Sequence, residues 1–222
     1  KFWQMIGRGT RLCPDLFGPG QDKEEFMIFD YCQNFEFFDE NPDGAIANNM
    51  KPLLQQIFEA KLKVSQLITN LANKTSADTE IRESYLSELH KTIQNLDENR
   101  FVVRKEFRYV TEYSNKKKWL NLSKSDVQEI NTHLSHLQPA SKEDDELARR
   151  FDMLVLIYQI LLLSGSGETG KYMSKIYRTA ASLQKKDNIP QIAIHLPLIK
   201  EAQTDAYWKT IDVKKLESLR IA

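Results

Sequence analysis

The stretch PLLQQIFEAKLKVSQLITNL, residues 52–71, decides the fold class, because its apolar residues recur at the spacing of a helix. Side chains three and four positions apart lie on the same face of an α-helix. The stretch therefore predicts one long amphipathic helix with a single face for burial. That face consists of Leu53, Leu54, Ile57, Phe58, Leu62, Leu67, Ile68 and Leu71.

The same spacing recurs along most of the remaining chain, in residues 86–96, 127–137, 147–161 and 172–183. Two of the expected helix starts match the capping-box pattern, Ser123 with Asp126 and Ser141 with Asp144. From usual helix lengths and short connections we expect a mainly α fold, a bundle of about six or seven helices. The leucines at this spacing are interpreted as core.

Length, charge and cysteine content limit the kinds of protein and of binding site that we expect. The chain has 222 residues, enough for one or two domains with a real core, and a formal net charge of +0, which argues neither for nor against nucleic acid. There are two cysteines, Cys13 and Cys32, without metal-ligand spacing, and the four histidines are scattered. We therefore expect no metal site and a reduced, cytoplasmic setting.

The most apolar run, MLVLIYQILLL at residues 153–163, contains Gln159 and follows charged residues. It is well short of the roughly 20 residues that span a bilayer. We read it as a buried helix and expect no membrane partner.

The composition changes near residue 45. Residues before it are rich in Gly, Pro and Phe and predict a helix, a loop and a strand at Phe26–Asp30. We expect a first domain at residues 1–44 and a helical domain at residues 45–222.

The segment QMIGRGTR, residues 4–11, places Arg8 and Arg11 three positions apart beside Gly7 and Gly9. A guanidinium is planar, permanently charged and forked, so it binds phosphate oxygens well. Glycines allow close backbone approach. The segment can be half of a phosphate site or a surface loop with two solvated arginines.

This segment resembles motif VI of superfamily-2 helicases, the signature Q-x-x-G-R-x-x-R, with Gln4, Gly7, Arg8 and Arg11 at its positions. The longer run over residues 4–38 is similar to the region after motif VI in motor subunits of type I restriction enzymes. There, GRGTRL is followed by a loop, a strand ending near an Asp and an aromatic segment, here Phe35, Phe37 and Phe38. The late segment NIPQIAIHLPLIKEAQTDAYW, residues 188–208, resembles the helical C-terminal part of such subunits.

The resemblance implies the C-terminal part of the ATP-dependent, DNA-translocating restriction (R) subunit, a hydrolase and endonuclease in its full-length form. Residues 1–44 would be a short remnant of the second RecA-like α/β lobe. Arg8 and Arg11 would act catalytically on ATP bound to the missing lobe, supported by Gln4 and Gly7. The full-length parent would bind ATP and Mg. This fragment by itself would bind neither and would have no enzymatic activity. The helical domain would dock the motor onto the methyltransferase and specificity subunits.

A second glycine-rich segment, SGSGETGKY, has the GxxxxGK spacing of a P-loop from Gly165 to Lys171. A P-loop continues with Ser or Thr, whose hydroxyl binds the magnesium ion, whereas Tyr172 stands here. We interpret the segment as a glycine-rich link between two helices.

The stretch NRFVVRKEFRYVTEYSNKKKWLNL, residues 99–122, interleaves cations with aromatic residues. Cations neutralise DNA phosphates and aromatic rings stack on exposed bases, so double-stranded DNA is a candidate partner. A half-buried helix with a solvated basic face is an equal alternative. The candidate DNA-binding residues are Arg100, Arg104, Lys105, Arg108, Lys116, Lys117 and Lys118; the interleaved rings are Phe101, Phe107, Tyr109, Tyr113 and Trp119.

Tyr207 and Trp208 follow a proline-punctuated segment and are candidate interface anchors; the alternative is that Trp208 simply closes the helical core. Two other functions remain open at this point. The chain can belong to another superfamily-2 DNA helicase or repair translocase. It can also be a non-enzymatic helical interaction module, in which QMIGRGTR is a chance match.

Overall fold

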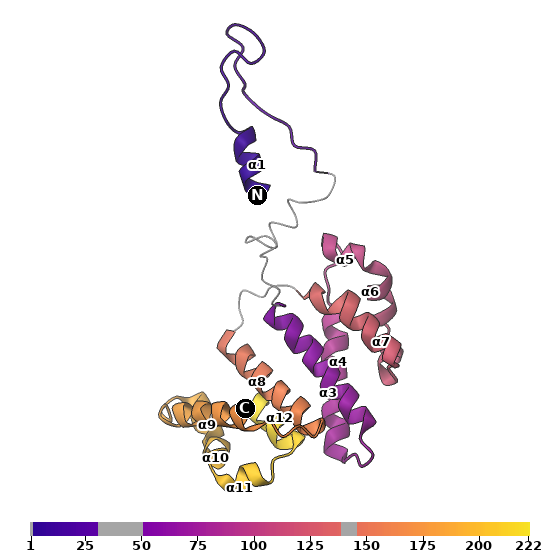
Figure 1. The fold of residues 1–222 in the computed structure, drawn as a ribbon, viewed down its shortest axis with the longest axis vertical. Helices are drawn as coiled ribbons and strands as arrows, with labels where there is room; N and C mark the ends of the chain where they lie inside the picture. Colours follow the sequence, from indigo (N-terminus) through magenta and orange to yellow (C-terminus); the bar gives the residue numbers. More distant parts are fainter. Residues whose placement is uncertain (1, 31–50, 139–145) are drawn as a thin grey trace. The chain divides into compact units, whose positions relative to one another are not determined.

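The computed structural model describes residues 2–30, 51–138 and 146–222. The chain divides into two compact units, Lys1–Ala45 and Ile46–Ala222, which are described separately (Figure 1). The aromatic segment at Phe35–Phe38 and the capping box expected at Ser141 and Asp144 lie outside the described residues.

The described part of the first unit consists of helix α1 (Phe2–Gly9), a series of turns, and residues 21–30 without regular structure. The strand expected at Phe26–Asp30 is wrong. A strand needs a neighbour to pair its backbone groups, and the described residues contain no second strand. The apolar side chains of this segment are exposed instead, as at Met27 and Phe29. A RecA-like α/β lobe is therefore not seen here.

The second unit starts with the pair α3 (Leu53–Asn70) and α4 (Ser76–Gln94), which pack against each other. The predicted apolar face of the first helix is confirmed, because Ile57, Phe58, Leu62 and Ile68 are buried. Thr75 begins α4 with a reciprocal capping box, which satisfies free backbone donors of the first turn.

Short helical segments follow and complete the first core. They are α5 (Phe101–Lys105), α6 (Phe107–Tyr113), the 3₁₀ turn η1 (Lys116–Leu120) and α7 (Lys124–Glu129). The last continues as a π-helical turn η2 (Ile130–Leu134) and a 3₁₀ turn η3 (Ser135–Leu137). The capping box predicted at Ser123 is confirmed. This core joins Leu62 of α3 and Leu89 of α4 to Ile130 and Leu134.

The chain then forms α8 (Glu146–Leu163), α9 (Gly170–Gln184), α10 (Pro190–Glu201), α11 (Asp205–Lys209) and α12 (Val213–Ile221). Helix α8 packs along α3 and against α12, as Figure 1 shows, so the apolar run expected to be a buried helix lies at the centre of the unit. No helix in the described ranges combines the length and apolarity that crossing a membrane requires.

The mainly α fold is confirmed, and no strand occurs in residues 2–30, 51–138 or 146–222. The expected number of six or seven helices is too low, since the described part of the second unit has ten α-helices, α3 to α12. The additional ones, such as α5 and α11, have only five residues each.

Candidate functional site

Helix α1 presents the two arginines of QMIGRGTR to solvent. Arg8 lies in the last turn of the helix and Arg11 two residues beyond its end, and both side chains are exposed. Gln4 and Gly7 are exposed as well. All four residues of the signature are thus accessible within the first unit, and the two guanidinium groups are free to meet an external anion.

Contacts from the following loop fix the end of α1. Lys23 donates from Nζ to the carbonyl of Gly9 and, at 3.2 Å, to the carbonyl of Arg11. The last carbonyls of a helix lack partners within the helix, so a lysine there satisfies them and complements the helix dipole. The loop itself is closed by the bond from the Lys23 amide to the carbonyl of Cys13 at 3.0 Å. Lys23 therefore fixes the backbone from which both arginines project.

The basic stretch at residues 99–122 forms α5, α6 and η1 rather than one helix. Several of its cations are engaged within the protein. Arg100 donates from Nη1 to the carbonyl of Leu137 at 2.9 Å, Lys118 pairs with Glu112 at 2.5 Å, and Arg108 lies 5.6 Å from the centre of the Tyr109 ring. Exposed side chains are found at Arg104, Lys105, Arg108, Lys116 and Lys117.

Two of the interleaved aromatic rings are core residues and are not accessible to nucleobases. Tyr113 is fully buried, and its hydroxyl lies 2.8 Å from Glu129 and 3.0 Å from Asp126. Trp119 is only 4% exposed and donates from Nε1 to the carbonyl of Tyr113. The expected stacking of these two rings on bases is therefore wrong, whereas Phe107 remains 50% exposed.

The segment SGSGETGKY links α8 to α9, as expected for a connection between two helices. A P-loop would follow a strand, but residues 153–163 are helical. Lys171 is exposed and lies 5.0 Å from the centre of the Tyr172 ring. The segment therefore lacks the strand–loop–helix order of a P-loop.

The candidate interface anchors lie in the core formed by α8 to α12. Tyr207 is 2% exposed and donates its hydroxyl to the carbonyl of Lys215 at 3.0 Å. Trp208 is half-buried, stacks on Tyr158 and donates from Nε1 to the carbonyl of Ala202 at 2.9 Å. In this arrangement both rings contribute to packing.

A buried polar cluster that the sequence did not reveal joins α4, α8 and α12. The Tyr85 hydroxyl lies 2.9 Å from Oε1 of Gln159 and within hydrogen-bond distance of Glu217. Arg220 donates to both carboxylate oxygens of Glu217, at 2.9 and 2.7 Å, and lies 3.6 Å from Asp152. Buried charges are stabilised only when they are paired and hydrogen-bonded in this way.

The environment shifts the pKa values of this cluster in different directions. Burial raises the pKa of Tyr85, and Glu217 raises it further. For Glu217 burial opposes ionisation, but the hydrogen bonds from Arg220 and Tyr85 outweigh it and lower the pKa. Burial raises the pKa of Asp152 despite the nearby Arg220. We interpret the cluster as a structural link between three helices, because its polar groups bond to one another across α4, α8 and α12.

We compared the chain with known proteins. No protein-family model, no curated protein and no solved structure matches it.

Within residues 2–30, 51–138 and 146–222, no group of three or more His, Cys, Asp or Glu side chains is placed to hold a metal ion.

Proposed function

We propose that this chain is the C-terminal part of the motor subunit of a type I restriction enzyme, an ATP-dependent DNA translocase. Arg8 and Arg11 would reach ATP and its Mg ion bound on another lobe of the full-length protein, where two guanidinium groups stabilise charge on the transferring phosphoryl group. The second unit would dock the motor onto the methyltransferase and specificity subunits.

One observation supports the motor role best, the presentation of both arginines from a fixed helix end. Arg8 and Arg11 are exposed, and no described carboxylate pairs with either of them. Lys23 holds the backbone on either side of the turn, at Gly9 and Arg11. A residue that stabilises a transition state needs such a fixed backbone, since small displacements of a catalytic group reduce the rate strongly.

The accessible face of Gly7 supports the same role. A Cβ atom added at Gly7 would meet no atom of this chain within 4 Å. Packing inside the first unit therefore does not require glycine at this position. Close approach of a nucleotide or of a second lobe would require it.

The test is the ATPase rate of the full-length parent carrying Arg8→Ala or Arg11→Ala. We expect each variant to lose about a thousandfold or more in turnover, the typical effect of removing an arginine finger. Arg178→Ala, on the exposed side of α9, is the matched control and should keep normal turnover. Near-normal turnover in both test variants would remove the motor assignment and favour a non-enzymatic interaction module.

A further inference from the structure

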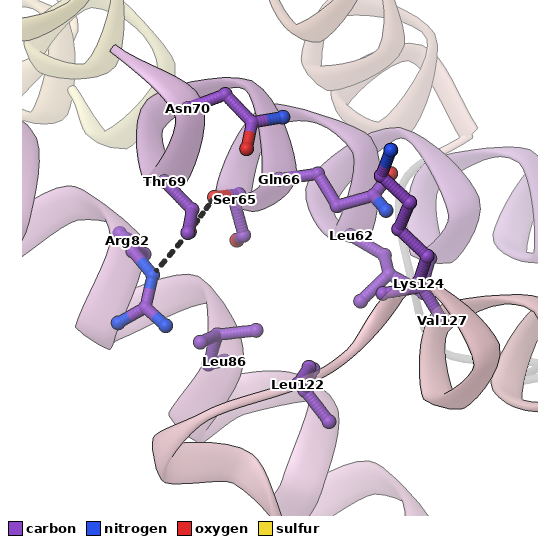
Figure 2. Close-up of a pocket in the computed structure, with 10 residues that line it drawn as sticks. All are labelled: Leu62, Ser65, Gln66, Thr69, Asn70, Arg82, Leu86, Leu122, Lys124 and Val127. Atoms are coloured by element: carbon purple, nitrogen blue, oxygen red, sulfur yellow. Dashed lines mark hydrogen bonds between the residues drawn. The ribbon is translucent and has the colours of Figure 1, made fainter. Parts of the chain in front are cut away.

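A small pocket lies in the second unit between α3, α4 and residues 122–127 (Figure 2). Its volume is about 70 Å³, far below the roughly 300–1,000 Å³ of pockets for drug-sized ligands. A nucleoside is therefore too large for it, whereas a group of a few heavy atoms fits. Its polar lining residues are Ser65, Gln66, Thr69, Asn70, Arg82 and Lys124, and the remaining lining residues are aliphatic.

The charged side chains of this lining are all positive. Arg82 and Lys124 contribute two cations, and no Asp or Glu belongs to the lining that the described residues form. Figure 2 shows Arg82 beside Thr69 on one side, and Lys124 with Gln66 on the other. The two cations lie on opposite sides of a space whose lining contains no carboxylate, and this favours an anionic occupant.

The guanidinium of Arg82 is held in place by its neighbours. It donates from Nε to Oγ1 of Thr69 at 2.8 Å and from Nη2 to the carbonyl of Leu120 at 3.5 Å. These bonds leave the Nη1 donors without a protein acceptor in the described ranges. An oriented guanidinium with unused donors is suited to bind a phosphate oxygen, because little conformational entropy is lost on binding.

Further donors line the same space. The side-chain amides of Gln66 and Asn70 make no hydrogen bond to another described residue. Lys124 is the first residue of α7, and Ser123 caps that helix. The pocket therefore combines two cations with two neutral amide donors, a set that matches the several acceptor oxygens of a phosphate group.

The pocket is also connected to the lysine tract, residues 116–118 of η1. Leu120, whose carbonyl accepts from Arg82, is the last residue of η1. The same segment carries Lys116 and Lys117, whose side chains are exposed. An extended phosphate-bearing ligand in the pocket would have further cations along the connected segment.

We propose that this pocket binds one phosphate group, held mainly by Arg82 and Lys124. The site rests on its own lining and is independent of the motor role. The phosphate group could come from either of two ligands, a nucleic-acid backbone or free inorganic phosphate.

The first experiment titrates the 222-residue chain with inorganic phosphate at constant ionic strength, with chloride as the balancing anion, and follows the Arg82 Nε–H resonance by NMR. We expect a saturable shift. In Lys124→Gln the dissociation constant should rise about tenfold, since one charge-assisted hydrogen bond is lost. Lys91→Gln, an exposed lysine of α4 outside the lining, removes the same charge and should leave the dissociation constant unchanged.

A shift that does not saturate, or that is the same in Lys124→Gln and Lys91→Gln, would overturn the proposal. Lys124 is the preferred test position because Arg82 bridges α3 and the end of η1, so Arg82→Gln changes packing as well as charge. Lys124→Arg keeps the charge and should restore the affinity, whereas failure of this rescue would contradict a cation–phosphate contact.

The second experiment replaces phosphate with a short DNA duplex of mixed sequence. If the source is a nucleic-acid backbone, DNA shifts the same Arg82 resonance, and Lys124→Gln weakens this binding and lowers its salt dependence more than Lys91→Gln does. If phosphate saturates the site while DNA leaves Arg82 unchanged, the pocket is a site for free phosphate. Failure of both ligands to shift Arg82 rejects the site and leaves the motor proposal untouched, since that depends on Arg8 and Arg11.

Discussion

At the scale of single residues, Gly7 and Gly9 of α1 have different surroundings although they lie two positions apart. A Cβ atom at Gly9 would clash with Cε2 of the Phe26 ring, whereas one at Gly7 would meet nothing within 4 Å. We therefore predict that Gly9→Ala displaces the Phe26 ring from the helix end. The measurement is the NOE between the ring protons of Phe26 and residue 9, which should disappear.

Gly7→Ala is the matched control for this prediction. It introduces the same methyl group into the same helix and should keep the NOE between Phe26 and Gly9. It should also make α1 slightly more stable, because alanine has the higher helix propensity by about 1 kcal/mol. An intact ring contact in Gly9→Ala would show that the ring position does not depend on glycine.

A variant of Trp208 can distinguish a core role from an interface role for this C-terminal aromatic residue. Its ring stacks on Tyr158 with 5.9 Å between centroids, and its Nε1 donor is satisfied by Ala202, which is fully buried. We predict that Trp208→Ala lowers the free energy of unfolding by about 3 kcal/mol, the lower end of the range for truncating core aromatic residues. Urea unfolding measures this loss.

Tyr177→Ala, at an exposed aromatic residue of α9, is the comparison and should change the free energy of unfolding by less than about 1 kcal/mol. Unchanged stability of Trp208→Ala together with lost binding to methyltransferase subunits would instead make Trp208 an interface anchor.

At the scale of elements, apolar periodicity predicts the long helices well and the short ones poorly. The stripe of Val127, Ile130, Leu134 and Leu137 is buried as expected, although the winding changes from α to π to 3₁₀ along it. A five-residue helix such as α5 spans little more than one turn, so no repeat can reveal it. The strand at Phe26–Asp30 failed because local propensity does not supply a pairing partner.

The polar cluster between α4, α8 and α12 was not predictable for a related reason. Tyr85 and Gln159 are 74 residues apart in sequence, and Tyr85 and Glu217 are 132 apart. Only tertiary packing brings them together, and none of them belongs to a local motif. Gln159 was the one visible signal, a polar residue inside the apolar run of α8. The pocket at Arg82 and Lys124 escaped sequence reasoning in the same way, since three elements form it.

We expect this cluster to make the packing of α12 sensitive to pH. The folded-state pKa of Glu217 lies below its ordinary value of 4.5, so its contribution to stability is present above that value and is lost as the pH falls through the folded pKa. We predict that Glu217→Gln destabilises the protein at neutral pH by about 3 kcal/mol, as expected for breaking a buried ion pair. It should also flatten the decline of unfolding free energy on the acid side of pH 4.5.

Asp152→Asn is the comparison, because the pKa of Asp152 is shifted upward whereas that of Glu217 is shifted downward. The folded-state pKa of Asp152 lies above its ordinary value of 3.8, so its ionisation costs stability as the pH rises through the folded pKa. The asparagine variant should therefore gain stability relative to wild type as the pH rises from acid to neutral. Unfolding free energies measured across this range test both variants, and parallel pH profiles for wild type and Glu217→Gln would contradict the role of Glu217.

At the scale of the whole molecule, the second unit contains its own cores. Among the described residues, the three clusters of buried apolar side chains lie between Ile57 and Leu219, and none includes a described residue of the first unit. Helix α3 contributes Leu62 to one cluster and Ile68 to another, while α8 contributes Tyr158 and Leu156 to two of them. These two long helices thus connect the cores into one folding unit.

We therefore predict that residues 46–222 fold without the first unit. The truncated chain should unfold in a single cooperative transition, with a midpoint within about 2 °C of the 222-residue chain, which at this size corresponds to less than about 1 kcal/mol. Circular dichroism during thermal unfolding measures this. A broad or much lower transition would mean that residues 1–45 stabilise the helical unit after all.

The same truncation separates the two functions that we assign to the two units. If the helical unit alone provides the docking surface, residues 46–222 should bind the methyltransferase assembly as tightly as the complete chain. Calorimetry with the purified methyltransferase and specificity subunits, each chain in turn, makes the comparison. A folded truncation that binds neither subunit would reject docking while leaving the arginine-finger role to be decided by the ATPase variants. Equal binding by both chains would place the docking surface entirely within residues 46–222.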